Sequence, residues 1–296
     1  MEGAMKPCII KAFNVLRLID VWVTPFIRIT SDLPRLKHFQ RFTEPFTSGN
    51  VPVVVQLMAV DAELAAQAAR ILTAQPGVSG INLNFACPSR QVVRHGAGGA
   101  QLKNPDGMFW ITERIRREIP DTSLSVKLRC GFDDPAEITG WIGKFRECGA
   151  DFAVIHCRTV KEIYEPLPKD ERILRLKNAA QAANGLPVVA NGDIYSLSDA
   201  LEYMESFDYA GLMSARGIFR DPGLLQRLQG KEMQSLDALG VELFNKVLEL
   251  SRSDEEIALR RSGLLETARM IWGSEAERFK NILKWTEEDF RCSKMI

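Results

Sequence analysis

Short apolar runs rich in β-branched residues recur along the first two thirds of the chain and predict seven strands. They are Val21–Thr30, Val51–Met58, Gly80–Cys87, Ser123–Cys130, Asp151–Arg158, Pro187–Ile194 and Tyr209–Arg216. Segments with helical periodicity lie between them, among them Asp61–Thr73, Pro105–Ile119, Pro135–Cys148 and Ser198–Met204. Strands that alternate with helices predict right-handed βαβ units and a parallel sheet covered on both sides.

Polar or reactive side chains close every predicted strand. They are Arg28, Gln56, Asn84 with Cys87, Lys127 with Arg129, His156 with Arg158, Asn191 with Asp193, and Arg216. In a doubly wound sheet such residues gather at one switch point, whereas in a barrel they ring the carboxyl ends of all the strands. The seven polar endings therefore favour an α/β fold of the (β/α)8 TIM-barrel type.

The predicted barrel is one strand short at its front. Met1-Glu2-Gly3 reads as a loop that follows a strand, and helical sequence from Lys6 to Leu16 comes next. We therefore expect the first strand to be missing or truncated.

The strand pattern stops beyond Gly217, and the sequence from Ser235 onward is helical. Its apolar residues Leu236, Leu239, Leu243 and Val247 recur at helix spacing. Ser253–Glu256 and Ser274–Glu277 read as capping boxes that open further helices. We expect a barrel domain over residues 1–230 and a small helical domain over residues 231–296.

Composition restricts the possible partners. Of the 296 residues, 46% are hydrophobic and 26% charged, and the formal net charge is +0, so nucleic-acid binding would need a local basic patch. The sequence contains neither a signal-peptide pattern nor about 18 consecutive apolar residues, so we expect a cytoplasmic protein without a membrane partner. The spacing of the six cysteines fits neither metal ligation nor a disulfide framework, which predicts free thiols and no metal site.

Residues 80–99 carry the densest chemistry. Ile81 and Leu83 alternate with Asn82 and Asn84 in a predicted strand, Cys87 and Pro88 follow, and a glycine cluster comes after them. Barrel strands present catalytic groups in this way. The alternative is that the Cys-Pro pair serves only packing and a turn.

Two predicted loops point to a bound phosphate, and three strand residues could contact a cofactor ring. The loops at Ala190–Asp193 and Ser214–Gly217 lie where barrels often bind phosphate, and Arg216 adds a cation, although both could be ordinary turns. Lys127 lies inside an apolar strand and needs an anion or acceptors nearby. In a flavin site it would stabilise the reduced ring, Gln56 would contact the ring edge, and His156 is either a similar contact or a satisfied core residue.

The segment Asn-Phe-Ala-Cys-Pro-Ser with its glycine-rich loop resembles the Asn-x-Gly-Cys-Pro signature of the tRNA-dihydrouridine synthases, nearest the bacterial C-type subfamily. The resemblance runs in order along residues 1–230. The other matching segments are Met1–Gly3, Phe26–Arg28, Val55-Gln56, Val126–Arg129, Ile155–Thr159, Ala190–Asp193 and Ala215–Gly217.

This resemblance implies an FMN enzyme that reduces the C5=C6 bond of a D-loop uridine in tRNA, with NADPH as reductant. It also implies that the enzyme acts as a monomer. Cys87 would protonate C5 as general acid, and Asn84 would hold the uracil. The resemblance implies a cofactor site made of Met1, Glu2, Gln56, Lys127, His156, Asn191, Gly192, Asp193, Ala215 and Arg216.

The target base would have to leave the RNA stack to enter such a site. For RNA binding we predict Arg28, Arg90, Arg94 and Arg158, with Lys103, Arg260, Arg261, Lys280 and Lys284 as further cations. The predicted tail itself holds 11 Lys and Arg against 13 Asp and Glu, a net charge of −2. Two other functions stay open, namely an FMN barrel dehydrogenase of a free pyrimidine and a catalytically inactive RNA-binding relative.

Overall fold

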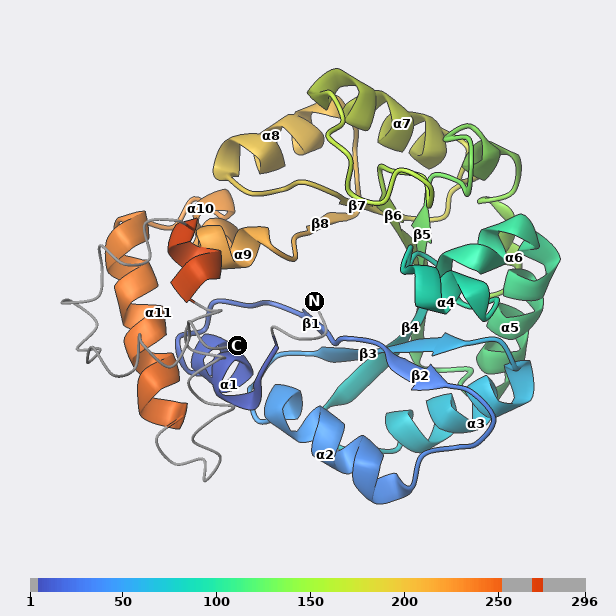
Figure 1. The fold of residues 1–296 in the computed structure, drawn as a ribbon, viewed down its shortest axis with the longest axis horizontal. Coiled ribbons are helices and arrows are strands. Elements are labelled where there is room, and N and C mark those ends of the chain that lie inside the picture. The colour runs from blue at the N-terminus through green and yellow to red at the C-terminus, as the bar shows by residue number, and fades with distance from the viewer. Residues whose placement is uncertain (1–4, 252–267, 274–296) are drawn as a thin grey trace.

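The computed structural model describes residues 5–251 and 268–273, and these form one parallel sheet wrapped by helices (Figure 1). The strands are β1 (Trp22–Val23), β2 (Ile27–Ile29), β3 (Val53–Ala59), β4 (Val78–Asn84), β5 (Ser123–Arg129), β6 (Phe152–His156), β7 (Val188–Asn191) and β8 (Gly211–Met213). β1 and β2 both pair with β3, and β3 to β8 then pair in sequence order, every pair being parallel. This is the predicted TIM-barrel arrangement.

The barrel has seven strand positions, because β1 and β2 share one. Within the described residues no pairing joins β8 to β1, so the sheet is open along that seam. Seven positions are one fewer than the eight of a complete (β/α)8 barrel.

The predicted strand Val21–Thr30 is divided into β1 and β2, a break that was not predicted. Pro25 has no N–H to give to the ladder. Thr24 takes part in its place, since its backbone N–H donates to the carbonyl of Val54 and its Oγ1 accepts from the N–H of Gln56 at 3.1 Å.

Helices cover the outer side of the sheet (Figure 1). They are α1 (Pro7–Val15), α2 (Leu36–Thr47), α3 (Ala62–Thr73), α4 (Arg90–Arg94), α5 (Pro105–Glu118), α6 (Lys144–Glu147), α7 (Lys169–Gln181), α8 (Leu197–Ser206), α9 (Gly217–Arg220), α10 (Leu224–Leu228) and α11 (Leu236–Ser251), with 3-10 turns η1 (Gly98–Lys103) and η2 (Glu137–Gly140). Of these helices, α2 and α7 were not predicted from the sequence. Within the described residues no helix is both long and apolar enough to cross a bilayer.

The predicted helix Pro135–Cys148 is wrong in its middle, where η2 and the short α6 replace it. The Glu137 carboxylate accepts from the backbone N–H groups of Phe132, Asp133 and Asp134 and so holds a tight turn at the start of the segment. The N–H of Ile138 then donates to the carbonyl of Cys130 instead of continuing a helix.

Side chains along each strand alternate between the helix layer and the barrel interior. Val55, Leu57, Ile81 and Leu83 belong to the main hydrophobic core with the helices. The alternate positions face the interior, and at the carboxyl ends of β3 to β7 they are polar: Gln56, Asn82, Asn84, Ser125, Lys127, Arg129, His156 and Asn191. TIM-barrel interiors are usually filled with branched apolar residues, so this polar interior marks a site.

The helical sequence after residue 230 packs against the start of the chain. Leu239, Leu243 and Val247 of α11 are buried in the same core as Phe13 of α1. Phe244 meets Trp272 of the second described segment with ring centroids 6.0 Å apart. Both predicted capping boxes, and the predicted site residues Met1, Glu2, Arg260, Arg261, Lys280 and Lys284, lie outside the described residues.

Candidate active site

The strand register brings most of the predicted site residues together. Asn84 is the register partner of Lys127, and Arg129 is the partner of His156, which is in turn the partner of Asn191. Because residues paired in register point to the same side of a parallel sheet, these five side chains line the carboxyl end of the barrel interior.

Three buried amides and a hydroxyl form a chain across the interior. Asn84 Nδ2 donates to Gln56 Oε1 at 2.7 Å, and Gln56 Nε2 donates to Asn82 Oδ1 at 2.7 Å. Asn82 Nδ2 donates in turn to Ser125 Oγ at 2.8 Å. The chain fixes the orientation of Asn84, whose Oδ1 also accepts from the N–H of Ala86 at 3.0 Å.

The Cys87 thiol follows β4 directly and is partly exposed. The backbone at Gly99 donates to the carbonyl of Cys87 at 3.0 Å. A Cβ on Gly98 would lie 2.9 Å from the Cys87 Cβ, so this glycine permits a close approach. Gly98 and Gly99 therefore pack against the thiol loop, whereas Gly96 faces open space.

Arg129 is a buried cation that holds this loop. Its guanidinium donates to the carbonyl of Ala86 at 2.9 Å, next to Cys87, and to the carbonyls of Thr159 and Ile163 in the loop after β6. Only 2% of the residue is exposed. Burial lowers the pKa of Arg129, and carbonyl acceptors replace the lost hydration.

Lys127 carries the most informative charge in the site. Burial and the neighbouring charge of Arg129 lower the pKa of Lys127 to about 8, while the Cys157 and Cys87 thiols act in the opposite direction. Its ammonium forms neither an ion pair nor a hydrogen bond with any residue in the described part of the chain. A partly buried cation without an acceptor at a site mouth is arranged to receive an anion.

His156 is held neutral. Burial lowers its pKa well below the ordinary value, and the surrounding charges of Lys127, Arg129, Arg158 and Arg216 lower it further. The backbone N–H of Arg158 donates to His156 Nδ1 at 3.2 Å. The ring proton is therefore on Nε2, which can donate to a bound group.

Asp193 gathers three arginines. Its carboxylate pairs with Arg158 at 2.5 Å, with Arg216 at 3.4 Å and with Arg172 at 3.7 Å. Burial alone would raise the pKa of Asp193, but the hydrogen bond and charge of Arg158 lower it. The cluster is cationic overall, because one carboxylate faces three guanidinium groups.

The predicted RNA role of Arg158 does not fit its position. Its side chain is 3% exposed and is committed to Asp193 and to the carbonyl of Glu165 at 2.7 Å. It holds the loops after β6 and β7, whereas Arg216 is 53% exposed and its contact with Asp193 is long. Arg216 is thus the arginine of the cluster that is free to meet a ligand.

The loops after β7 and β8, where the sequence predicts a phosphate site, are held by a glycine and by an asparagine hydrogen bond. Gly192 has φ +124, and a Cβ there would lie 2.6 Å from Cys157 Sγ, so glycine is required. Asn191 Nδ2 donates to the carbonyl of Met213 at 2.8 Å and joins the two loops, and Ala215 beside Arg216 is exposed.

Two tyrosines that were not predicted from the sequence lie at this edge. The Arg216 guanidinium lies 5.4 Å from the ring of Tyr164 and 5.2 Å from that of Tyr195. Tyr164 is 60% exposed. Tyr195 directly follows the predicted strand Pro187–Ile194, and this position was the available signal in the sequence.

Three of the predicted RNA-binding arginines lie on the other side of the mouth. Arg28 is the register partner of Met58, which packs beside Phe26 and Cys87. Its Nε is enclosed and has no hydrogen-bond partner among the described residues. Arg90 and Arg94 are exposed on α4, which begins three residues after Cys87.

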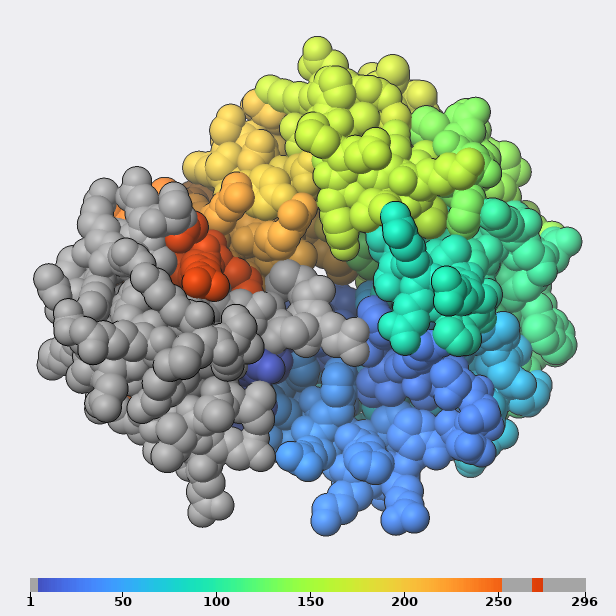
Figure 2. Space-filling model, in the orientation of Figure 1, coloured from blue at the N-terminus to red at the C-terminus, as the bar shows by residue number. Residues whose placement is uncertain are grey.

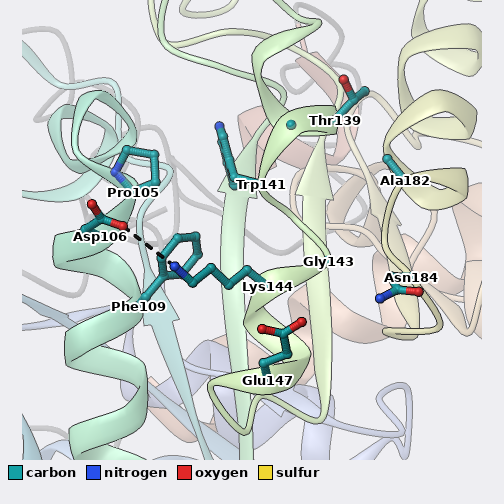
Figure 3. Close-up of a pocket in the computed structure, with 11 residues that line it drawn as sticks. Pro105, Asp106, Phe109, Thr139, Trp141, Gly143, Lys144, Glu147, Ala182 and Asn184 are labelled. Carbon is teal, nitrogen blue, oxygen red and sulfur yellow. Dashed lines mark ion pairs between the residues drawn. The ribbon is translucent and has the colours of Figure 1, made fainter.

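A separate pocket of about 440 Å³ lies among α5, α6 and the end of α7, on the outer side of the sheet (Figure 3). Lys144 pairs with Asp106 across it at 3.8 Å and lies 4.7 Å from the ring of Phe109. It contains none of the predicted site residues. The described residues include no group of three or more His, Cys, Asp or Glu side chains placed to hold a metal.

The protein is a parallel α/β barrel with a thiol in a loop at its mouth and with a chain of amides and an unpaired lysine in its interior. These features define its class as a barrel with a reactive, cationic site at the carboxyl ends of its strands. The sequence model of the dihydrouridine synthase (Dus) family matches residues 10–292. The chain belongs to the dihydrouridine synthase family, as the sequence predicted.

Curated relatives support the family assignment. The chain is 33% identical over 218 residues to a tRNA-dihydrouridine(16) synthase of Cupriavidus necator, covering 71% of this chain and 66% of the relative. It is 30% identical to a tRNA-dihydrouridine(16) synthase of Haemophilus influenzae, covering 76% and 73%. The matches with Cupriavidus necator and with Ralstonia nicotianae, at 66% and 65%, span just under two thirds of those relatives.

Solved structures show the same fold at low identity. A 2-naphthoyl-CoA reductase has a TM-score of 0.59 at 12% identity and covers 77% of this chain and 48% of its own. The old yellow enzyme of Trypanosoma cruzi has a TM-score of 0.55 at 7% identity, covering 78% and 85%. These likenesses confirm the barrel fold.

Proposed function

We propose that the protein is a flavin-dependent tRNA-dihydrouridine synthase, which reduces the C5=C6 bond of a D-loop uridine with FMN as cofactor and NADPH as reductant. The observation that carries this proposal is that Cys87 and Asn84 share one barrel mouth with the unpaired Lys127. Cys87 is close enough to affect the pKa of Lys127. The relatives named for tRNA-dihydrouridine(16) synthesis support the RNA substrate.

The residues present fit a flavin mononucleotide. Lys127 offers an unpaired ammonium and His156 an Nε2–H, two donors suited to the oxygen and nitrogen edge of a flavin ring. Gln56 keeps one amide hydrogen free beyond its bond to Asn82. Arg216, with the backbone at Gly192 and Ala215, would hold the phosphate, and Asn191 and Asp193 the ribityl side; Met1 and Glu2 are assigned from the family resemblance alone.

When bound, FMN supplies the hydride for C6 of the uracil. The chain's own residues do the rest. Asn84 is fixed by Gln56 and by the N–H of Ala86, so its amide can hold the uracil in one orientation. Cys87 holds the proton on Sγ and transfers it to C5 as general acid.

The remaining parts of the proposal concern the whole protein. We infer that residues 1–230 form the catalytic barrel and residues 231–296 a helical tRNA-binding part, and that the protein acts as a cytoplasmic monomer. The core that α11 shares with α1 holds this helix, the described part of the segment, against the barrel.

The direct test is to load the purified full chain with FMN and supply NADPH and unmodified tRNA, with dihydrouridine measured by mass spectrometry. We expect Cys87→Ala to retain the flavin absorbance and to lose dihydrouridine. Cys148→Ala is the matched control, because this thiol lies on the outer side against Glu113 at 3.6 Å, and it should keep the activity.

Each other outcome would favour one of the alternative functions or exclude a proposed role. Turnover of free uracil or orotate, with none on tRNA, would establish the pyrimidine dehydrogenase. A protein that binds tRNA but cannot be loaded with FMN would be the inactive relative. Full activity in Cys87→Ala would remove the thiol from the mechanism.

A further inference from the structure

Two sequence segments beside Cys87 carry almost all of their charge as cations. Residues 21–43 contain Arg28, Arg35, Lys37 and Arg41 against the single acid Asp32, and residues 74–105 contain Arg90, Arg94 and Lys103 and no acid. The whole chain has a net charge of +0, so this local excess is balanced elsewhere. The distribution is therefore polarised, as nucleic-acid-binding surfaces are.

Six of these cations lie on β2, α2 and α4 or in the loop between β2 and α2. α2 follows β2, and α4 follows β4, and both of these strands pair with β3. Figure 2 shows the blue surface of β2 and its following loop bordering the teal surface of α4 on one face. We define the basic arc as Arg28, Arg35, Lys37, Arg41, Arg90 and Arg94.

The arc cations are uncompensated, unlike others of the surface. None of the six makes an ion pair with any residue in the described ranges. On the outer helices, by contrast, Arg70 pairs with Glu118, Arg117 with Glu113 and Lys144 with Asp106. All arc residues except the partly buried Arg28 are exposed.

The spacing within the arc is unfavourable to the helices themselves. Lys37 and Arg41 stand at i,i+4 on α2, and Arg90 and Arg94 stand at i,i+4 on α4. Like charges at this spacing lie on one face and destabilise a helix. An external polyanion that bridges the two cations of each pair would remove the repulsion.

We propose that the basic arc binds the phosphate backbone of the tRNA, so that the RNA leaves the mouth across β2, α2 and α4. This deepens the proposed function and rests on it in one respect, that the target base enters the mouth beside Cys87. Continuity with that mouth favours RNA over an anionic lipid surface, because Arg28 packs at the same edge as Met58 and Cys87.

Salt dependence of tRNA binding tests the arc. The probe is the flavin-free full chain with an unmodified fluorescent tRNA, titrated by anisotropy over a range of salt concentrations. K falls as salt rises, and each lost phosphate contact lowers the magnitude of the slope of log K against log salt by about 0.7 to 0.9. We expect Arg35→Gln/Lys37→Gln/Arg41→Gln to lower it by about 2 and Arg90→Gln/Arg94→Gln by about 1.5.

The matched control is Arg70→Gln/Arg117→Gln/Lys144→Gln, which removes the same charge from paired cations on α3, α5 and α6. Its slope should equal that of the wild type. Equal slopes for the α2 triple variant and this control would overturn the proposal. It would also be overturned if the arc variants lost binding to phosphatidylserine vesicles but bound tRNA as the wild type does.

Turnover separates this result from the proposed function. If the arc variants lose their salt slope while the wild type makes no dihydrouridine, the arc stands and the activity falls. If dihydrouridine forms normally and the slopes do not change, the activity stands and the arc falls.

Discussion

Arg129 donates a 2.9 Å hydrogen bond to the carbonyl of Ala86, the residue immediately before Cys87. The same guanidinium reaches the carbonyl of Thr159 at 2.6 Å and that of Ile163 at 2.9 Å. Ile163 is a β-branched residue with φ +50, a conformation that needs support from its surroundings. One buried side chain thus ties the thiol loop to the loop after β6.

We expect Arg129→Lys to lower the free energy of unfolding by about 2 to 3 kcal/mol, because carbonyls lose their donor in a buried place. It should also change the rate at which iodoacetamide alkylates Cys87. Arg116→Lys is the control, since Arg116 binds the carbonyls of Ile119, Pro120 and Thr122 at the opposite end of the barrel. An unchanged Cys87 rate in Arg129→Lys, with the stability lost as in the control, would limit Arg129 to a general stabilising role.

The two left-handed glycines after Cys87 allow a paired test. Gly96 has φ +70 with nothing within 4 Å of an added Cβ, whereas Gly98 has φ +55 and its Cβ would meet Cys87. Gly96→Ala should cost about 1 kcal/mol of stability from backbone strain alone. Gly98→Ala should cost more in denaturant titrations and should also displace the thiol, which a change in its alkylation rate would report. Equal effects of the two substitutions would show that the contact with Cys87 is unimportant.

We expect the charge of Lys127 to lower the stability of the flavin-free fold while it favours cofactor binding. Below pH 8 the lysine is charged in both the folded and unfolded chain, and the folded chain bears the desolvation cost. Between pH 8 and 10.5 only the unfolded chain keeps the proton, so this contribution raises stability as pH rises.

We therefore expect flavin-free Lys127→Met to be more stable than the wild type by up to about 3 kcal/mol at pH 7, with the difference shrinking toward pH 10.5. Urea unfolding at both pH values measures it, and flavin binding by the variant should weaken. Lys177→Met, on the exposed side of α7, is the control and should change neither. A less stable Lys127→Met at pH 7 would contradict the desolvation argument.

Asp193 is expected to hold Arg158 in the fold. Asp193→Asn should cost about 3 to 5 kcal/mol, because it leaves the buried guanidinium without its anion. The Asp193→Asn/Arg158→Met double variant should recover part of this loss, and a double-mutant cycle by thermal or urea unfolding measures the coupling. Strictly additive effects would mean that Arg172 and Arg216 supply the main contacts of Asp193.

Periodicity alone located most of the strands, because buried parallel strands are continuous apolar runs such as Val53–Ala59. It failed at Pro135–Cys148, where the Glu137 carboxylate makes a local turn that competes with the helix. It also missed α2, which continues through Pro45 although a proline inside a segment argues against a helix. Local hydrogen bonds and single residues decided these elements against the periodic signal.

The sequence by itself determined the family and the residue types at the mouth, since Cys87, Lys127 and His156 each lie near or just after the carboxyl end of a strand, in order along the chain. Only the tertiary structure decided what each of them touches. Arg158 and Arg216 both follow strands in the same way, yet one is buried against Asp193 and the other is exposed. Gly98 and Gly99 likewise proved to contact the thiol loop, because the three-dimensional arrangement of the segments sets the packing distances between them.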